Sequence, residues 1–488
     1  MTNGRTNIVL VVMDTAREID TTYIRNAVNN SCLEELATTG AEYNHAFANA
    51  PWTLPSHTSM FTGTYTSKHG THAGSKFYNG QFPTIADLLS NDGYQTVGFT
   101  NNAWVTDEFG LASGFEGMSK VWQYIQSDTD FGKIKLTSEG KGGLVREGIS
   151  GLVSGDILAN FVNAVYGQFF YRRNDYGAKR TNTLVENWIK NRDQSSPFFM
   201  FINYLEPHLD YQPPKRLVEQ FLPEGSTYRE AMAVPQKPWE YTAGVLGMSD
   251  HDFELLRALY RAEIAYLDEQ IGELRSTLKQ HGEWDDTVLI IVGDHGENIG
   301  DHGLMDHQYS LHDTLLHVPL IVHGGQFNQV GDSDRLIQTL DLFPTILDIA
   351  GLTIPEHTQG TSFYPKSSTA PRNEAIGEYL APQPSIENLS NQTDVPEEEL
   401  EVFGQSIRSI RTTEYKLIRK SGGEISLYNV GDDPDEQTDI SSEKPDIRDE
   451  LVERLDAWLE SFEQTSAMGR DEEMSEGTKR RLEDLGYI

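Results

Sequence analysis

The residues Ile8-Val9-Leu10-Val11-Val12-Met13 form an unbroken apolar run that ends in the carboxylate of Asp14. A short run of this composition predicts a strand covered on both faces, as in the centre of a parallel sheet. In open α/β sheets, ligands bind beyond the carboxyl ends of the strands, so Asp14 is placed for chemistry. A turn or capping aspartate is the alternative interpretation of this residue alone.

Further apolar runs alternate with amphipathic segments through the first three quarters of the chain. The other predicted strands are 96–99, 197–204, 287–292 and 318–322. The predicted helices are 31–38, 84–93, 252–279 and 341–347. Such alternation is typical of a mostly parallel sheet with helices on both faces. We therefore predict an α/β catalytic domain over residues 1–375.

The last quarter of the chain has a different pattern. Two predicted strand segments, 408–420 and 424–429, are followed by a predicted helix at 446–463. We predict a small α+β subdomain over residues 376–488. Residues 111–180 fit neither pattern, and there we predict an insertion or lid near the active site, with an oligomer contact or plain core as alternatives.

Composition limits the classes of function. The 488 residues are 38% hydrophobic and carry a net charge of -35, which disfavours binding to nucleic acid or an anionic membrane. The acid-rich, lysine-poor chain predicts a halophilic source, where salt screens self-repulsion. The single Cys32 excludes an internal disulfide. No apolar run is long enough to span a bilayer and no signal-peptide pattern is seen, so we expect a cytoplasmic protein.

A second stretch, Pro51-Trp52-Thr53-Leu54-Pro55-Ser56-His57, predicts the start of a helix that ends at Gly63. Because proline is tolerated in the first helical turn, we expect Thr53 at the helix entry, near its unpaired N–H groups and positive dipole end. Such a position favours an anion or an ionised oxygen. Thr53 is therefore a candidate nucleophile if a metal or a base activates it. A capping cluster of Thr and Ser is the alternative.

Two other predicted strands are followed by residues that bind metals or protons. One is followed by His208, and another by Asp294-His295. A carboxylate beside an imidazole suits a hard-to-borderline divalent ion. Combined with Asp14 and Thr53, these residues predict a metal-activated nucleophile. The cation would also supply the positive field that an anionic substrate needs in so acidic a protein.

Several short pieces of the chain match the motifs of one family. They are Val11-Val12-Met13-Asp14-Thr15, Thr53-Leu54-Pro55-Ser56-His57 with Thr62-Gly63, Glu206-Pro207-His208, Gly293-Asp294-His295-Gly296-Glu297, Gly300-Asp301-His302-Gly303 and Val318-Pro319-Leu320-Ile321. Near the end come Leu427-Tyr428-Asn429, Asp433-Pro434-Asp435-Glu436 and Leu485-Gly486-Tyr487. On these motifs the chain resembles the sulfatase family within the alkaline phosphatase superfamily. The resemblance implies an alkaline-phosphatase-like α/β fold and a metal-dependent ester hydrolase.

The chain departs from the family pattern at the nucleophile. Family sulfatases carry a Cys or Ser that is converted to formylglycine, whereas this position is Thr53, and Cys32 lies outside any such context. His57 replaces the signature arginine, and His307 or Gln308 replaces the lysine of the late metal-site segment. A threonine nucleophile resembles the phosphodiesterase and phosphotransferase branches of the superfamily instead.

The residues and the resemblance together imply a set of roles. The expected ligands of a divalent ion (Ca, Mn, Mg or Zn) are Asp14, Asp294 and His295. The expected catalytic residues are Thr53, His57, His208 and His302. The expected substrate-binding residues are His307 and Lys68.

The resulting hypothesis is a hydrolase that cleaves phosphate or sulfate esters through a covalent intermediate on Thr53. The substrate is expected to be a small anionic ester, with a sugar or a lipid head group as possible alcohols. A phosphothreonine can be cleared by a second in-line attack of water, which favours phosphate. A phospho-alcohol transferase, a sulfuric ester hydrolase without formylglycine and a catalytically silent binding protein are the alternatives.

Overall fold

The computed structural model describes residues 5–123 and 175–465, together with 474, 478, 479, 481 and 482. Of the predicted insertion at 111–180, the part from 124 to 174 lies outside the described residues. Among the helices of the described ranges, none combines the length and the apolar character that crossing a membrane requires.

The central sheet is built around β1 (Asn7–Met13), the apolar run at the start of the chain. Strands β5 (Phe198–Tyr204) and β6 (Thr287–Gly293) flank it in parallel. The other strands are β2 (Ala41–Phe47), β3 (Gln95–Thr100), β4 (Gly117–Lys120), β9 (Leu320–His323) and β10 (Gly331–Gln338). Their order is β10-β2-β9-β6-β1-β5-β3-β4, and only β9 runs antiparallel to its neighbours. The prediction of a mostly parallel sheet is confirmed.

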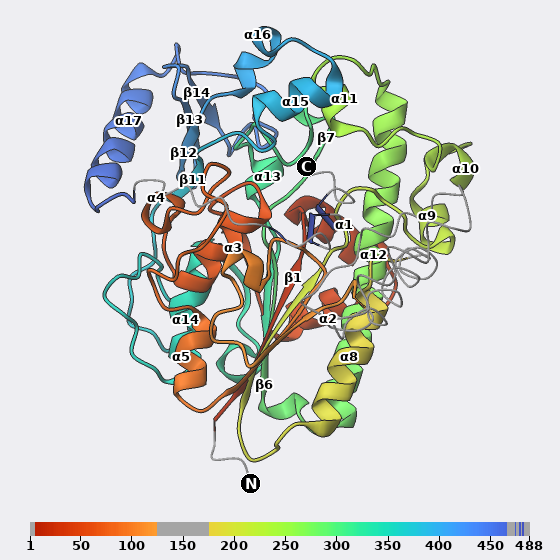
Figure 1. The fold of residues 1–488 in the computed structure, drawn as a ribbon, viewed down its shortest axis with the longest axis vertical. Coiled ribbons are helices and arrows are strands. Elements are labelled where there is room, and N and C mark those ends of the chain that lie inside the picture. The colour runs from red at the N-terminus through yellow and green to blue at the C-terminus, as the bar shows by residue number, and fades with distance from the viewer. Residues whose placement is uncertain (1–4, 124–174, 466–473, 475–477, 480, 483–488) are drawn as a thin grey trace, which may run out of the picture.

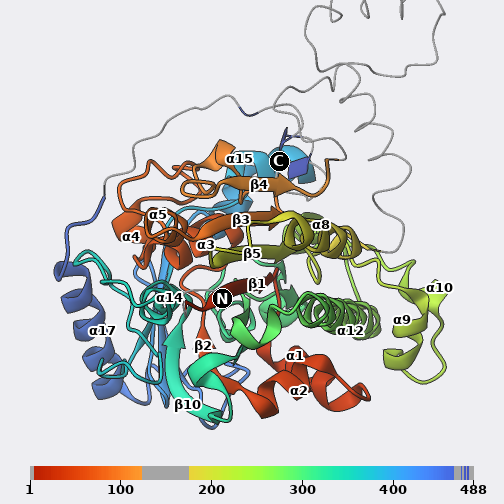
Figure 2. The same cartoon turned by 90° about the horizontal axis from the view of Figure 1, so that it is seen from below.

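Both faces of this sheet are covered, as the unbroken apolar run required. Even-numbered side chains of β1 pack into one core cluster and odd-numbered ones into the other. One face carries α3 (Thr53–Thr62), α5 (Ile85–Asn91) and α14 (Leu342–Ala350). The other carries α1 (Glu18–Ala27), α2 (Cys32–Thr39), α8 (Ala178–Asn191) and α12 (Asp250–Gln280). Figure 2 shows the sheet edge-on between these two layers.

The predicted helices and central strands agree with the structure to within a few residues. The helix predicted at 252–279 is α12, which begins after the capping residue Ser249. The helix predicted at 84–93 is α5, whose N-cap Thr84 forms a capping box with Asp87. The strand predicted at 318–322 begins only at Leu320, because Pro319 has no N–H for the ladder.

Short elements connect the main ones. The helices are α4 (Thr66–His69), α9 (Lys215–Phe221), α10 (Tyr228–Ala231), α11 (Pro238–Thr242), α13 (Asp313–Leu316), α15 (Ile386–Thr393) and α16 (Glu397–Leu400). A two-stranded ribbon pairs β7 (Asn298–Ile299) with β8 (Met305–Asp306). This ribbon follows β6 and belongs to the loops beyond the carboxyl ends of the central strands.

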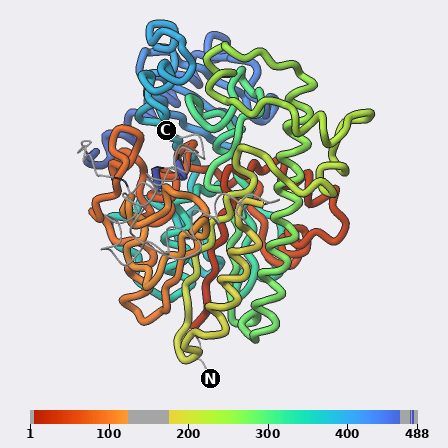
Figure 3. Tube along the Cα trace, turned by 45° about the vertical axis from the view of Figure 1, so that its right-hand side comes forward, coloured from red at the N-terminus to blue at the C-terminus, as the bar shows by residue number. Residues whose placement is uncertain are grey.

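The C-terminal region forms a second sheet, which is antiparallel. Its strands are β11 (Ala375–Tyr379), β12 (Ile407–Arg411), β13 (Tyr415–Lys420) and β14 (Ile425–Asn429). Leu451 and Leu455 of α17 (Pro445–Glu460) belong to the same core cluster as Leu417 of β13. In Figures 1 and 3 this sheet, drawn in blue, lies at the end of the molecule away from the start of β1. The predicted small α+β subdomain is present.

A buried ion-pair network ties the second sheet to the first domain. Lys416 of β13 is fully buried, and its Nζ lies 2.6 Å from Asp313 Oδ1 and 2.9 Å from Glu436 Oε1. Arg411 adds a contact of 3.0 Å to Asp313 Oδ2. Since Asp313 begins α13, this network connects the second sheet to the segment that follows the β7–β8 ribbon.

We predict that Lys416→Met lowers the free energy of unfolding by about 3–5 kcal/mol, because it leaves two carboxylates buried without their shared cation. The measurement is urea denaturation of the full chain. The matched control is Lys420→Met on the same strand, which removes a surface pair with Glu424 of 3.0 Å. That control should change stability by about 0.5 kcal/mol or less. Equal effects of the two substitutions would contradict this account of the network.

Candidate functional site

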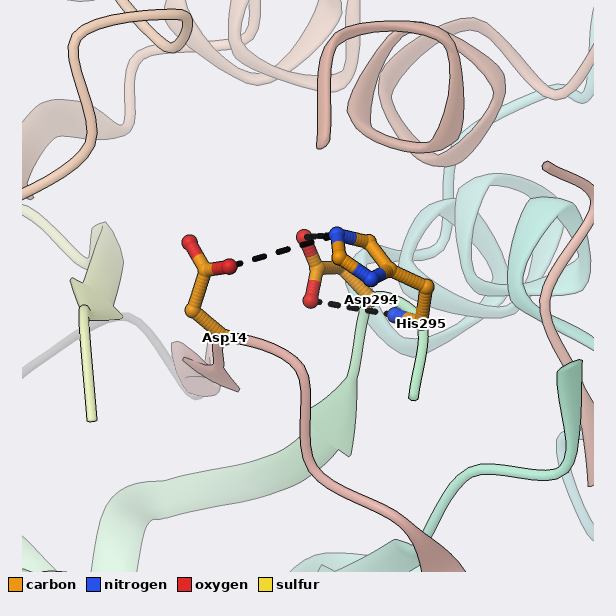
Figure 4. A group of neighbouring side chains, drawn as sticks. All are labelled: Asp14, Asp294 and His295. Carbon is orange, nitrogen blue, oxygen red and sulfur yellow. Dashed lines mark hydrogen bonds and ion pairs between the residues drawn. The ribbon is translucent and has the colours of Figure 1, made fainter. Parts of the chain in front are cut away.

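Three side chains meet where β1 and β6 end. Asp14 follows β1, and Asp294 and His295 follow β6, the neighbouring parallel strand. His295 Nε2 lies 3.3 Å from Asp294 Oδ2 and 4.0 Å from Asp14 Oδ1. Figure 4 shows the three groups turned toward one another. The predicted metal ligands are thus brought together, and their ligand atoms lie within 4.8 Å of one another.

The hydrogen bonds of this cluster leave its inward atoms available. Asp294 Oδ1 accepts from the Thr15 and His295 N–H groups, but Asp294 Oδ2 is buried and accepts no hydrogen bond from any described residue. Asp14 Oδ1 is also buried, and no described residue donates a hydrogen bond to it. His295 Nδ1 lies 3.0 Å from the Gly296 carbonyl, to which it donates, so Nε2 presents a lone pair. Two orphaned carboxylate oxygens and one imidazole lone pair fit a divalent cation.

The burial and the electrostatics of these groups also favour a bound divalent cation. All three groups are fully buried. Burial and the neighbouring Asp14 carboxylate raise the pKa of Asp294 well above its usual value. Burial lowers the pKa of His295 well below its usual value, which keeps the imidazole neutral. A bound cation would offset the repulsion between the two carboxylates. The neutral imidazole would bind the same cation through its lone pair.

Thr53 lies beside this cluster, as predicted. It is the first residue of α3, and its Oγ1 lies 3.4 Å from His295 Nε2. Ser56, also in the first turn, donates to the Asp294 carbonyl at 2.6 Å and so ties the helix to the end of β6. The Thr53 hydroxyl therefore stands at the positive end of a helix and against the metal-ligand cluster.

Two asparagines that the sequence did not assign complete the site. Asn102 Nδ2 donates to Asp14 Oδ2 at 2.7 Å and to Thr53 Oγ1 at 3.2 Å. Asn203 Nδ2 donates to the same Asp14 oxygen at 3.1 Å. Asn102 follows the end of β3, and that position was a usable signal. Asn203 lies inside the apolar strand β5, where nothing in the local pattern marks it.

His57 and His208 both contact the site. His57 Nδ1 donates to the Thr53 carbonyl at 2.9 Å and lies 3.5 Å from Asp294 Oδ2. Burial lowers the pKa of His57 to about 4, so the ring is neutral. Its edge-to-face contacts with Phe61 and Phe201 place it against the core side of α3. Burial also lowers the pKa of His208, whose ring centroid lies 5.3 Å from that of His307.

His307 carries the positive charge of the site. Its ring centroid is 4.5 Å from that of His295, and its Nδ1 contacts Asp306 and lies 3.7 Å from Glu297 Oε1. Burial alone would lower the pKa of His307, but the two carboxylates raise it well above its usual value. Asp306, Glu297 and His307 are also spaced so that they could hold a metal ion.

Two predicted site residues are engaged elsewhere. The ring of His302 stacks on that of His312, with centroids 3.6 Å apart. Lys68 Nζ donates to the His357 carbonyl at 2.6 Å. The described contacts connect neither residue to Thr53 or the metal-ligand cluster. Cys32 is buried on α2, on the opposite face of the sheet from α3.

Comparison with known proteins gives distant relatives that match over most of the chain. The chain is 24% identical over 446 residues to arylsulfatase K of Bos taurus, covering 85% of this chain and 74% of the relative. It is 24% identical over 507 residues to an arylsulfatase of Clostridium perfringens, covering 97% of this chain and 96% of the relative.

Solved structures share the fold. A phosphonate monoester hydrolase of Agrobacterium radiobacter superimposes with a TM-score of 0.68 at 20% identity, covering 93% of this chain and 96% of that chain. A protein solved with its substrate D-glucosamine-2-N,6-O-disulfate gives a TM-score of 0.66 at 20% identity, covering 93% and 98%. The sulfatase family model matches residues 6–352, which is well over half of the chain. The chain therefore belongs to the sulfatase family.

Proposed function

We propose that this protein is a metal-dependent hydrolase of phosphate or phosphonate esters that uses Thr53 as its covalent nucleophile. The observation that carries the proposal is the position of Thr53 Oγ1, 3.4 Å from His295 Nε2 and 3.2 Å from Asn102 Nδ2. Arylsulfatases and phosphonate monoester hydrolases are among the relatives and structural neighbours, which supports an ester hydrolase.

The chain supplies the parts of a nucleophilic attack. Thr53 Oγ1 is oriented by the Asn102 amide and lies at the N-terminal end of α3, which favours a developing alkoxide. Asp14, Asp294 and His295 would hold a divalent cation. Such an ion lowers the proton affinity of a hydroxyl beside it and neutralises the charge of the transferred group.

Two histidines have chemistry suited to the transferred group. The imidazolium of His307, fixed by Asp306 and Glu297, would bind the non-bridging oxygens of the substrate. His208, held neutral by burial, would accept and return a proton during attack and departure. His57 would position Thr53 through its backbone carbonyl.

The second half of the reaction distinguishes phosphorus from sulfur. A formylglycine hydrate expels sulfate by collapsing to the aldehyde, but an ester of Thr53 has no such route. It must be cleared by water attacking the transferred atom, with release of the Thr53 oxygen. A phosphoryl group carries more charge for a cation and an imidazolium to bind than a sulfuryl group does, so phosphothreonine should turn over more readily.

We predict that Thr53→Ala lowers kcat by about 10⁴-fold or more while the protein remains folded, because the attacking oxygen is gone. The measurement is steady-state hydrolysis of phenyl phosphate and phenylphosphonate monoesters, with circular dichroism for folding. The matched control is Thr58→Ala on the same helix, whose hydroxyl donates to the Leu54 carbonyl at 2.7 Å. Undiminished turnover by the Thr53 variant would remove the proposed nucleophile.

Asp294→Asn is expected to separate metal binding from folding. Removing one of two adjacent buried carboxylates should stabilise the metal-free protein by about 1–4 kcal/mol, since like charges no longer share a dry site. The same change should abolish the rise in melting temperature caused by added Mn, Zn, Ca or Mg and lower activity by about 100-fold. The checks are thermal melts with and without EDTA and metal content by mass spectrometry. A variant that still binds one ion per chain with wild-type affinity would contradict the assigned ligands.

The substrate preference is tested with phenyl esters that differ only in the transferred group. We expect kcat/KM for phosphate or phosphonate to exceed that for sulfate by about 100-fold, because clearing the Thr53 ester limits the sulfate reaction. Assays at low and molar salt are compared because the net charge is -35. Intact mass should show a phosphoryl adduct on Thr53 after rapid quenching. A preference for sulfate with unmodified Thr53 would reverse this assignment.

A further inference from the structure

Lys76 is a lysine that the proposed chemistry does not use. It lies between a short bridge that joins His72 to Ser75 and the hydrogen bond of 3.0 Å from Tyr78 N to the Phe109 carbonyl, so its backbone is fixed on both sides. Its side chain is mostly buried, and its Nζ lies 5.5 Å from the ring centroid of Trp104. A cation over an aromatic face is weakly stabilised, by about 0.5–2 kcal/mol.

Lys76 has no carboxylate partner in the described part of the chain. The acidic residues that follow Trp104 in the sequence are Asp107 and Glu108. Both pair with Lys120 instead, at 2.9 and 3.1 Å. Burial lowers the pKa of Lys76 to about 8, and no charged group opposes that shift. In a chain with 74 acidic and 39 basic residues, a mostly buried lysine without an acidic partner requires an explanation.

The location of Lys76 connects it to the nucleophile. The backbone N–H of Trp104 donates to Asn102 Oδ1 at 3.0 Å, and the Nδ2 of the same amide donates to Thr53 Oγ1. The indole of Trp104 also packs edge-on against Trp52, the residue before Thr53, with centroids 5.4 Å apart. Trp104 therefore contacts Lys76 through its ring, and contacts the residues on either side of Thr53 Oγ1 through its backbone and its ring.

A desolvated cation without a counter-ion costs folding free energy. A desolvated charge near a nucleophile is a candidate for function, and the function that a buried ammonium suits is the binding of a negative charge. The transferred group is already served by His307 and the cluster of Asp14, Asp294 and His295. The charge left for Lys76 is a second one on the same substrate molecule.

We propose that Lys76, on the face of Trp104, binds a second anionic group of the substrate, a carboxylate, sulfate or phosphate carried by the alcohol part of the ester. The inference rests on the proposed function and specifies its substrate class as esters of acidic alcohols. Lys76 is then a specificity residue: it contributes to the binding of the alcohol part and leaves attack by Thr53 unaffected.

The test compares phenyl phosphate with its 2-, 3- and 4-carboxyphenyl analogues. Wild type should prefer at least one carboxylated isomer by about 10–100-fold in kcat/KM, the effect of a charge-assisted hydrogen bond. Lys76→Met should abolish that preference and change phenyl phosphate turnover by less than about threefold. Lys76→Arg should retain it. The matched control is Lys279→Met. Lys279, near the C-terminal end of α12, also lies over an indole, with its Nζ 5.4 Å from the Trp284 ring centroid.

Two further measurements keep the inference separate from the proposed catalysis. Binding of phenylphosphonic acid and its carboxylated analogues to Thr53→Ala, by calorimetry, should show the same preference even if no ester is turned over. The melting temperature of Lys76→Met should equal or exceed that of wild type, because a desolvated charge has been removed. No preference for any isomer, an equal loss for phenyl phosphate, or a lower melting temperature would overturn the role of Lys76.

Discussion

The repulsion between two buried carboxylates governs the rest of this structure. Met13 of β1 pairs with Gly293 of β6, so the parallel register places the next residues, Asp14 and Asp294, side by side. Neither carboxylate can reach water there. The surrounding donors satisfy only the outer oxygens, through Asn102 and the neighbouring backbone, and leave the inner ones facing each other. A site that is unfavourable when empty is well prepared to bind a cation.

The segments beyond the carboxyl ends of the strands also bring positive charge to the site. Helix α3 aims its positive end at the site and brings Thr53 to the cluster. On the other side, Asp306 and Glu297 keep His307 charged. The protein has net charge -35, yet it gathers cationic and cation-binding groups around one hydroxyl. Local arrangement, and not overall charge, therefore sets the chemistry available to an anionic substrate.

Membership in the sulfatase family accounts for the fold of this chain. The departures from the family motifs account for the features that distinguish it. In the mechanism that we propose, the covalent ester of Thr53 must be cleared by water, which places greater demands on the groups that bind the transferred oxygens. The proposed role of Lys76 extends this arrangement outward, because no acidic residue of the described ranges pairs with this cation. Together the two proposals imply a substrate with more negative charge than a simple aryl sulfate.

Local sequence determined the central strands, the long helices and the order of the strand ends, because continuous apolar runs and helix caps are short-range signals. The edge strand β10 and its neighbour β2 were not predicted, since partly exposed strands mix polar and apolar residues. Motif residues such as Asp14, Thr53 and Asp294 were found because each follows or begins an element. Only the tertiary structure assigned Asn203, separated His302 and Lys68 from the cluster, and singled out Lys76. Those outcomes depend on register, burial and the partners of each side chain, which are properties of distant segments brought together and which no local pattern records.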